Sequence, residues 1–339
     1  MGVEGAMPNH VGLGAGWQPE LSEILEITDL PGSLAMVPRV WTVGSIRSAF
    51  LEVLMKLALL RCSTLPEPDM DEAPTLAACR AAGIETELVN WDEPDAEAKV
   101  EAGGFDLCVI RATWDYLHHP ERFVAWLERA HERSRVANPP EVVRWNIHKR
   151  YLAEIADAGI DVVQTSFFTK GDSIDLQAVV ADRGWERFVV KPSISCGSFM
   201  TRWFDRARTD DAQRFLDDIL TTRDAMVQRF EPRVEQGGER CLVWIDGELT
   251  HAIRKQPRFD DDEESVESCE ISSADRELAE RVLSVAPKPL LYARVDVFEG
   301  EDGAPMLSEL ELIEPSLFFP FGERGLERFV DAAQKWAVR

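Results

Sequence analysis

Two apolar strand patterns near the C-terminus carry charged residues at alternate positions. Arg294 and Asp296 are two residues apart in the first pattern, and Glu309 and Glu311 are two residues apart in the second. Because successive side chains of a strand point to opposite faces, each pair is expected on a single face of its strand. The Asp-Gly pair at 302–303 predicts the turn of a hairpin between them. Such a hairpin would bring three carboxylates and one guanidinium together on one sheet surface.

These carboxylates predict a metal site. Carboxylates on a surface otherwise built from Val, Leu and Phe repel one another unless a cation lies between them. Oxygen ligands that leave open coordination positions suit Mg²⁺ carrying substrate phosphates. We therefore interpret Asp296, Glu309 and Glu311 as metal ligands in a nucleotide site, in preference to carboxylates that hold no metal.

The composition indicates a globular chain and excludes two classes of partner. Of the 339 residues, 45% are hydrophobic and 29% are charged, so the chain is long enough for two or three domains. The net charge of −24 repels nucleic acids and anionic membranes. It does not exclude ATP, because charges are screened beyond roughly 8–10 Å and a few nearby Lys and Arg residues can outweigh the net charge at a binding site. No apolar run approaches the roughly 20 residues that span a bilayer.

The cysteines and the start of the chain predict a cytoplasmic protein. The six cysteines form no CxxC pair and most lie in apolar runs, so buried free thiols are expected rather than disulfides or zinc ligands. The first residues have neither the basic nor the apolar region of a signal peptide. Residues 1–54 are rich in Gly and Pro at first and lack a strand–helix rhythm, so we expect a mostly disordered appendage.

Strands and helices alternate after residue 54, which predicts a parallel sheet covered by helices. The expected strands are 55–62, 86–91 and 105–111, with helices up to Gly83 and from Pro120. Beyond Asn138 the rhythm changes. There we expect helices over 146–158, 173–183, 210–221, 273–286 and 323–338, strands over 162–168, 188–191, 198–204 and 226–230, a hairpin of 240–245 with 248–253, and an acidic mobile loop at 260–264.

Arg111 and Asp115 follow a strand of the first sheet, where ligands of parallel sheets gather. They could bind a substrate carboxylate and a substrate amine. The alternative is a structural ion pair beside a packed Trp114. His118, His119 and His251 show no metal-binding spacing, so solvated or supporting roles are expected.

Lys191 ends an apolar strand and precedes a small, hydroxyl-rich loop at 192–198. It is either an edge lysine whose ammonium reaches solvent or a phosphate ligand, because backbone N–H groups and Ser hydroxyls of such a loop can surround phosphate oxygens. The loop is not a Walker A motif, since no GK[ST] follows. Taken alone, Lys149, Lys255 and the segment 228–231 are consistent with exposed surface positions.

Together these motifs occur in the order found in ATP-grasp carboxylate–amine ligases, which the chain resembles over about residues 55–320. The resemblance implies an α/β ATP-grasp fold with a Rossmann-like N-terminal domain. It implies ATP-binding roles for the phosphate lysines Lys149 and Lys191, for loop residues Ser193, Ser195, Gly197 and Ser198, for hinge residues Gln228, Arg229, Phe230 and Glu231 at adenine, and for Glu239 at ribose. Glu311 replaces the Asn of the usual Glu-x-Asn metal pair, which retains an oxygen ligand and adds a charge.

The segments 113–116, 145–152 and 309–319 look more narrowly like the subgroup that contains the cycloserine-forming O-ureido-serine cyclo-ligase. The resemblance implies a first α/β domain over 55–142, a central lid subdomain over 143–224 and a C-terminal subdomain with the metal site over 225–339. Because dimers are common in the family, a homodimer is an expectation as well.

We therefore hypothesise an ATP-dependent ligase that joins a small amino-acid-like carboxylate to an amine through an acyl phosphate. Two Mg²⁺ ions, with Mn²⁺ able to substitute, would bridge the phosphates, while Arg294 and Lys255 would stabilise charge in catalysis. Arg111, Asp115, Glu314 and Ser316 are the expected substrate residues. The alternatives are an ATP-grasp kinase that stops at phosphorylation and a regulator that binds ATP without chemistry.

Overall fold

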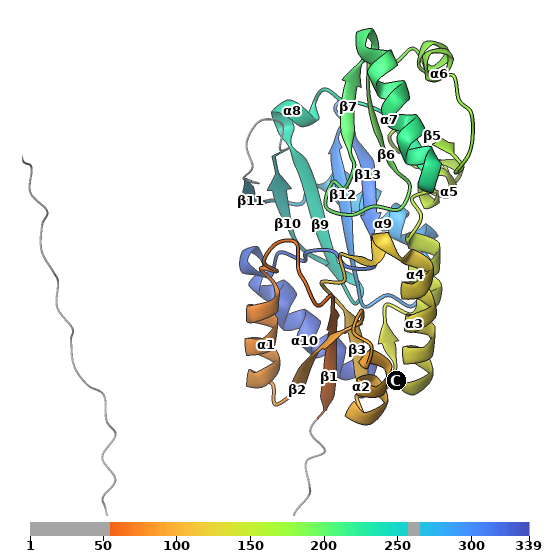
Figure 1. Cartoon of the computed structure of the whole chain (residues 1–339). Helices are drawn as coiled ribbons and strands as arrows, with labels where there is room; N and C mark the ends of the chain where they lie inside the picture. Colours follow the sequence, from red (N-terminus) through yellow and green to blue (C-terminus); the bar gives the residue numbers. More distant parts are fainter. Residues whose placement is uncertain (1–54, 257–264, 339) are drawn as a thin grey trace, which may run out of the picture. The chain divides into compact units, whose positions relative to one another are not determined.

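The computed structural model describes residues 55–256 and 265–338. The expected disordered segment 1–54 and the acidic loop at 260–264 lie outside the described residues. Three sheets and their covering helices make up the described part of the chain (Figure 1). Within these ranges, no helix combines the length and the apolar character needed to cross a membrane.

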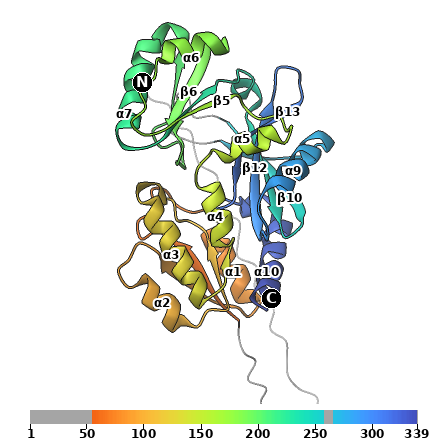
Figure 2. The same ribbon diagram turned by 90° about the vertical axis from the view of Figure 1, so that its right-hand side faces the viewer.

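The first sheet is parallel, with the strand order β2-β1-β3-β4, and its strands are β1 (Lys56–Arg61), β2 (Glu85–Asn90), β3 (Leu107–Ile110) and β4 (Val136–Ala137). Helices α2 (Ala96–Gly103) and α3 (Pro120–Arg133) pack on the face of Ala58 and Leu60. Helices α1 (Glu72–Ala81) and α10 (Glu323–Ala337) pack on the face of Leu57 and Leu59 (Figure 2). The parallel sheet covered by helices, expected from the alternation, is confirmed, and the helices lie on both of its faces.

The second sheet is antiparallel, with the order β5-β8-β6-β7, and consists of β5 (Thr165–Phe168), β6 (Arg187–Pro192), β7 (Arg202–Asp205) and β8 (Ala225–Arg229). Helices α6 (Leu176–Arg183) and α7 (Thr209–Thr222) form its core together with Phe188, Val190 and Val227. Because β8 belongs to this sheet, the sheet continues past the expected boundary at residue 224.

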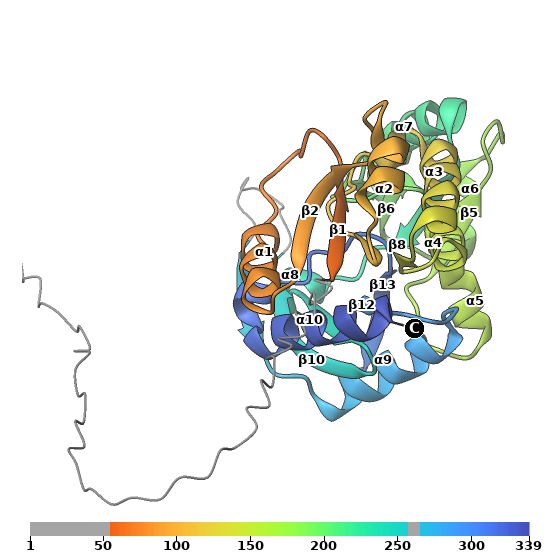
Figure 3. The same ribbon diagram turned by 90° about the horizontal axis from the view of Figure 1, so that it is seen from below.

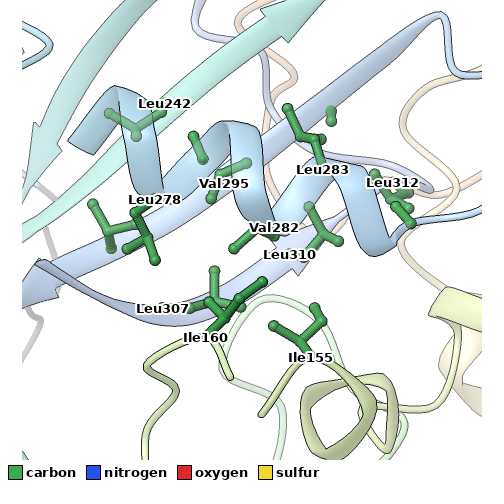
Figure 4. Close-up of a cluster of buried hydrophobic side chains, with 14 of the residues drawn as sticks. Ile155, Ile160, Leu242, Leu278, Val282, Leu283, Val295, Leu307, Leu310 and Leu312 are labelled. Carbon is green, nitrogen blue, oxygen red and sulfur yellow. The ribbon is translucent and has the colours of Figure 1, made fainter. Parts of the chain in front are cut away.

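The third sheet has the order β11-β10-β9-β12-β13, and its strands are β9 (Glu239–Ile245), β10 (Glu248–Lys255), β11 (Val266–Cys269), β12 (Tyr292–Glu299) and β13 (Pro305–Glu311). Val295 is paired in register with Leu242 on one side and with Leu310 on the other, so the three side chains share one face. Helix α9 (Ser273–Val285) covers this face with Leu278 and Val282 (Figure 4). Both expected hairpins of this sheet are confirmed.

The opposite face of the third sheet is apolar at one end and polar at the other. Val243, Ile245 and Tyr292 belong to the core shared by α10 and the first sheet. Figure 3 shows α10 between the first sheet and the third. Further along the same face, Cys241 and Asp296 are paired in register. The apolar end of this face therefore packs against α10 and holds the third sheet in place, while the other end carries ionisable residues.

The helix expected over 146–158 starts later in the structure. It corresponds to α5 (Tyr151–Asp157), and a separate helix that was not expected, α4 (Pro140–Asn146), precedes it. The Asn146 side chain bonds the backbone of β13, and the amide of Lys149 donates to the carbonyl of Ser193 at 2.8 Å rather than to a helical carbonyl. Lys149 consequently lies in the turn between the helices.

Other differences have local causes. The strand expected over 198–204 starts at Arg202, because Ser198 and Met200 have φ of 59° and 49°, which no strand allows. The strand expected over 162–168 begins at Thr165, and Val162 forms an isolated bridge instead. Helix α2 was not expected, because it buries only Ala96 and Val100 and so has little apolar pattern. The short elements β4, β11 and α8 (Val234–Gly237) and three 3-10 helices (Tyr116–His118, Arg206–Arg208 and Phe319–Phe321) were also not expected.

Candidate active site

The hairpin of β12 and β13 places the expected charged residues on one face. In its register Arg294 is opposite Glu311, and Asp296 is opposite Glu309. A β-bulge follows Asp296, so the side chains beyond it no longer keep the same alternation. All four side chains therefore project from the face of the third sheet that α9 does not cover.

Arg294 connects the carboxylates on this face. Its Nε and Nη2 donate to the two oxygens of Asp296 at 2.8 and 2.7 Å, and Nη2 also donates to Glu311 at 2.5 Å. Burial by itself would lower the pKa of Arg294, but Asp296 and Glu311 raise it well above its usual value. Burial raises the pKa of Glu311 to about 7, although Arg294 opposes this shift.

Glu309 lies between the two lysines expected at the phosphates. Its Oε1 is 2.5 Å from Nζ of Lys149, and its Oε2 is 4.0 Å from Nζ of Lys191. Lys149 also donates to the carbonyl of Ser195 at 2.7 Å. Burial would raise the pKa of Glu309, but Lys149 and Lys191 lower it below its usual value. Burial lowers the pKa of Lys191.

A third group of charges extends this face toward β10. Nζ of Lys255 is 3.3 Å from a carboxylate oxygen of Glu239. Ligand atoms of Glu239, Cys241 and Asp296 all lie within 4.8 Å of one another. Cys241 has no exposed surface, and burial, with Asp296 next in effect, raises its pKa well above its usual value. All six cysteines are free, as expected.

These residues fit a magnesium–triphosphate group. Each of these carboxylates forms an ion pair with a basic side chain: Asp296 and Glu311 with Arg294, Glu309 with Lys149, and Glu239 with Lys255. A phosphate chain would offer these cations new partners and release carboxylate oxygens, which are the ligands Mg²⁺ prefers. The buried hydroxyl of Ser193 has no hydrogen-bond partner among the described residues, so it is a donor suited to a phosphate oxygen.

The loop at 192–198 is buried at its start and exposed at its end. Ser193 and Ser195 are 0% and 5% exposed, whereas Gly197 and Ser198 are exposed. The hydroxyl of Ser195 donates to the carbonyl of Pro192 at 3.3 Å, so in this structure it is engaged inside the loop rather than directed at a ligand.

Segment 228–231, the expected adenine hinge, comprises the last two residues of β8 and the two residues after it. The amide of Phe230 donates to the carbonyl of Arg187 at 3.0 Å, and the Arg187 guanidinium lies 3.8 Å from the centre of the Phe230 ring. Glu231 is 5% exposed and its carboxylate is 3.4 Å from Arg229. Burial raises the pKa of Glu231. The segment is therefore held firmly against β6.

Arg111 lies in a buried ion pair with Asp71. Its Nη2 is 3.1 Å from Oδ2 of Asp71, and the two side chains are 5% and 1% exposed. Its guanidinium lies over the rings of Tyr292 and Phe319, at 5.6 and 6.0 Å from their centres. This is the structural ion pair that the sequence left open as the alternative, with Asp71 as the partner. This pair engages Nη2, whereas the buried Nη1 has no hydrogen-bond partner among the described residues, so the contact of Arg111 with a substrate carboxylate stays a prediction.

The other residues expected at the substrate lie in segments that contact the charged face. Asp115 accepts a hydrogen bond from Nε1 of Trp91 at 2.6 Å. Glu314 is 7% exposed, and burial followed by the charge of Glu311 raises its pKa to about 8, against a hydrogen bond with Tyr116. The carbonyl of Ser316 accepts a hydrogen bond from Nη1 of Arg294 at 3.2 Å.

Sequence reasoning missed Asp71 and the place of His251. The carboxylate of Asp71 accepts hydrogen bonds from the N–H groups of Leu317 and Phe319. No local sequence pattern could predict these contacts, because some 250 residues separate Asp71 from the two donors. Nε2 of His251 lies 2.8 Å from the carbonyl of Leu317, which agrees with the supporting role expected for this histidine. Alternation from Glu239 along β9 could have placed Cys241 on the charged face.

Comparison with known proteins gives consistent relatives. The family described as D-cycloserine synthetase DcsG, N-terminal domain, matches residues 57–138. The cycloserine biosynthesis protein DcsG of Streptomyces lavendulae is 31% identical over 301 residues, which cover 81% of this chain and 97% of that protein. The crystal structure of D-cycloserine synthetase DcsG has a TM-score of 0.75 at 30% identity, with 83% of this chain and 99% of that chain covered. The ATP-grasp ligase PsnB, complexed with minimal precursor, Mg and ADP, has a TM-score of 0.58 at 19% identity, with 84% and 98% covered, which shows a shared fold.

Proposed function

We propose a reaction for this chain, which belongs to the DcsG family of ATP-grasp ligases and is an ATP-dependent ligase. In this proposal it forms a C–N bond and releases ADP. The substrate would be a small amino-acid-like carboxylate. The observation that carries the proposal is the presence of two groups of ion pairs on one face, Arg294 with Asp296 and Glu311, and Lys149 with Glu309. A face with alternating charges of this kind suits a polyanion and its counter-cation together.

In the proposed first step, the γ-phosphoryl group moves from ATP to a carboxylate oxygen of the substrate and ADP leaves. Lys149 and Lys191 would bind phosphate oxygens, and Arg294 with Lys255 would stabilise the charge on the group in transfer. Asp296, Glu309 and Glu311 would hold the magnesium, two ions in the proposal, with Mn²⁺ able to substitute. When bound, the metal neutralises charge on the β- and γ-phosphates.

In the proposed second step, an amine nitrogen attacks the acyl carbon, the acyl C–O bond to phosphate breaks, and the amine loses a proton. No covalent nucleophile of the protein is required. The acyl phosphate hydrolyses readily, so the loop at 192–198 would have to exclude water. The thiol of Cys196 in this loop donates to the carbonyl of Trp114 at 3.1 Å, which connects the loop to the segment that follows β3 of the first sheet. Asp115, Glu314 and Ser316 would contact the substrates.

The same proposal assigns binding residues to the adenine and the ribose of ATP. The backbone of 228–231 would bind adenine and Glu239 would bind ribose. The ranges 55–142, 143–224 and 225–339 are proposed as the three domains, and the pairing of β8 with β5 and β6 supports moving the second boundary to residue 229. We also propose a cytoplasmic enzyme, a homodimer, and no nucleic-acid partner, the last supported by the net charge of −24.

The test is an ATP-dependent phosphate-release screen with amino acids, short peptides and O-ureido-serine, supplied singly and in pairs. Release that depends on a pair of compounds would support ligation between molecules, and release with one compound that yields a ring would support cyclisation. Asp296→Asn is the control for a contaminating ATPase. A stable phosphorylated product without any amine requirement would contradict ligation and indicate a kinase. Binding of ATP–Mg²⁺ without phosphate release would indicate a regulator.

A further inference from the structure

The segment from Glu314 to Phe319 leaves β13 and forms one border of the charged face. Two contacts connect it to the catalytic arginine. The carbonyl of Ser316 accepts from Nη1 of Arg294 at 3.2 Å, and the Arg294 guanidinium lies 5.5 Å from the centre of the Phe318 ring. The other two nitrogens of this guanidinium are Nε, which donates to Asp296, and Nη2, which donates to Asp296 and Glu311. The position of the Ser316 carbonyl therefore contributes to the direction in which Arg294 points.

Asp71 holds this segment from the first sheet's side. Its Oδ2 accepts the N–H of Leu317 at 2.5 Å, and its Oδ1 accepts the N–H of Phe319 at 2.8 Å. Between these two residues, Phe318 has a φ of 51°, in the left-handed region that a bulky residue adopts only when its surroundings enforce it. One buried carboxylate thus bonds the backbone on both sides of the strained residue.

Arg111 stabilises this carboxylate in its buried position. Asp71 is fully buried, and an unpaired charge there would be strongly unfavourable. Nη2 of Arg111 supplies the opposite charge at 3.1 Å, while its guanidinium lies over Phe319. On the other side, Nε2 of His251 bonds the carbonyl of Leu317 at 2.8 Å.

We propose that Asp71, with Arg111 as its counter-charge, is a positioning residue that holds the segment 314–319 so that the Ser316 carbonyl aligns Arg294 for phosphoryl transfer. The inference rests on the proposed function. It assigns to Asp71, a residue just before α1, a role in a reaction that occurs on the third sheet. It also explains why Arg111 is buried against a carboxylate.

The test compares Asp71→Asn with Asp275→Asn. Asp275 is 2% exposed and accepts two hydrogen bonds from Arg240 at 2.7 and 3.1 Å, on the face that α9 covers, so it is a matched buried ion pair away from the site. Both variants should lose stability. Only Asp71→Asn should lower kcat per folded enzyme, on the order of 10- to 100-fold, with the KM for ATP nearly unchanged. Folded enzyme is counted by near-ultraviolet circular dichroism below the unfolding transition.

Two further variants keep the proposal open to refutation if Asp71→Asn does not fold. His251→Gln removes the second anchor of Leu317 and should lower kcat by a smaller factor. Arg111→Met should lower kcat rather than raise the KM of the carboxylate substrate, whereas a substrate ligand would do the reverse. Single-turnover ADP formation by Arg294→Lys should fall little further when Asp71→Asn or His251→Gln is added, because both act through Arg294.

A normal kcat per folded enzyme in these variants, or losses that multiply fully with Arg294→Lys, would overturn the positioning role while leaving the ligase assignment intact. Absence of turnover by the unmodified protein with every compound and pair tested would instead refute the proposed function.

Discussion

Arg294 and Asp296 form a bidentate ion pair within one strand, with the guanidinium donating to both carboxylate oxygens at 2.8 and 2.7 Å. Both side chains are almost fully buried, at 6% and 2% exposed. Each carboxylate oxygen has a second lone pair, so Asp296 can retain Arg294 and still offer an oxygen to a cation. The pair therefore places a permanent positive charge next to the proposed magnesium position.

Asp296→Asn should abolish metal-dependent ADP formation. The amide has one carbonyl oxygen and no charge, so it binds Mg²⁺ weakly and presents an N–H₂ group to Arg294. We expect a loss of at least about 10²–10³-fold in kcat, as for the removal of a preorganised electrostatic group. The measurement is coupled ADP release at saturating ATP. Glu299→Gln, on the exposed end of the same strand, is the control and should retain turnover.

Thermal shifts give an independent check of the same site. A non-hydrolysable ATP analogue with Mg²⁺ should stabilise the unmodified protein, because a ligand that binds only the folded state shifts unfolding by mass action. The part of this shift that requires Mg²⁺ should be absent in Asp296→Asn. An equal Mg²⁺-dependent shift in both proteins would count against Asp296 as a ligand.

Lys149→Met should destabilise the protein without ligands. It would leave Glu309, whose side chain is 21% exposed, with only the more distant Lys191, and removing one partner of a largely buried pair costs about 3 kcal/mol. Lys99 forms an equally short pair with Glu93 at 2.5 Å, but on the surface. Lys99→Met is the matched comparison, and its urea midpoint should be unchanged. Equal losses in both variants would show that pair geometry alone, without burial, sets the energy.

The stability of the ligand-free protein should decrease toward alkaline pH because Glu314 has to ionise in a buried position. Its pKa is raised from 4.5 to about 8, so the stabilising contribution of the protonated carboxyl is complete below about pH 4.5 and is lost as pH rises through about 8. Between these values one such group changes stability by about 1.4 kcal/mol per pH unit at most. Glu311, with a pKa of about 7, acts in the same direction.

Glu314→Gln should remove the Glu314 part of this decline and leave that of Glu311. Urea unfolding from about pH 5 to about pH 9 would measure both slopes, since the slope reports the difference in bound protons. Parallel slopes in the two proteins would contradict the raised pKa of Glu314.

Leu242→Ala should lower the free energy of unfolding by about 2–5 kcal/mol, the range for truncating a fully buried leucine. Leu242 packs beneath α9 with Leu278 and Val295, on the face opposite the charged residues (Figure 4). Met70→Ala is the control, since Met70 is 41% exposed and its loss should change stability by less than about 0.5 kcal/mol. Chemical denaturation at neutral pH measures both. A loss below 1 kcal/mol for Leu242→Ala would mean that α9 closes over the cavity.

Much of the candidate site follows from short-range sequence patterns. Asp296, Glu309 and Glu311 share a face because alternation along a strand and a short Asp-Gly turn are local properties, and the register of β12 and β13 agrees. Lys191 could be singled out by its position at a strand end, whereas only the resemblance to ATP-grasp ligases singled out Lys149. The distances of both lysines to Glu309 could not be predicted, because these depend on how the second sheet meets the third.

The sequence alone determined the alternating strands, the hairpins and the residue types that make a face of carboxylates and cations, since backbone geometry repeats every two or four residues. Only the tertiary structure decided that Arg111 pairs with Asp71 and that Asp71 bonds the backbone at Leu317 and Phe319. Such contacts join residues that are far apart along the chain. Their partners are selected by packing of whole sheets and helices, for which no local pattern exists.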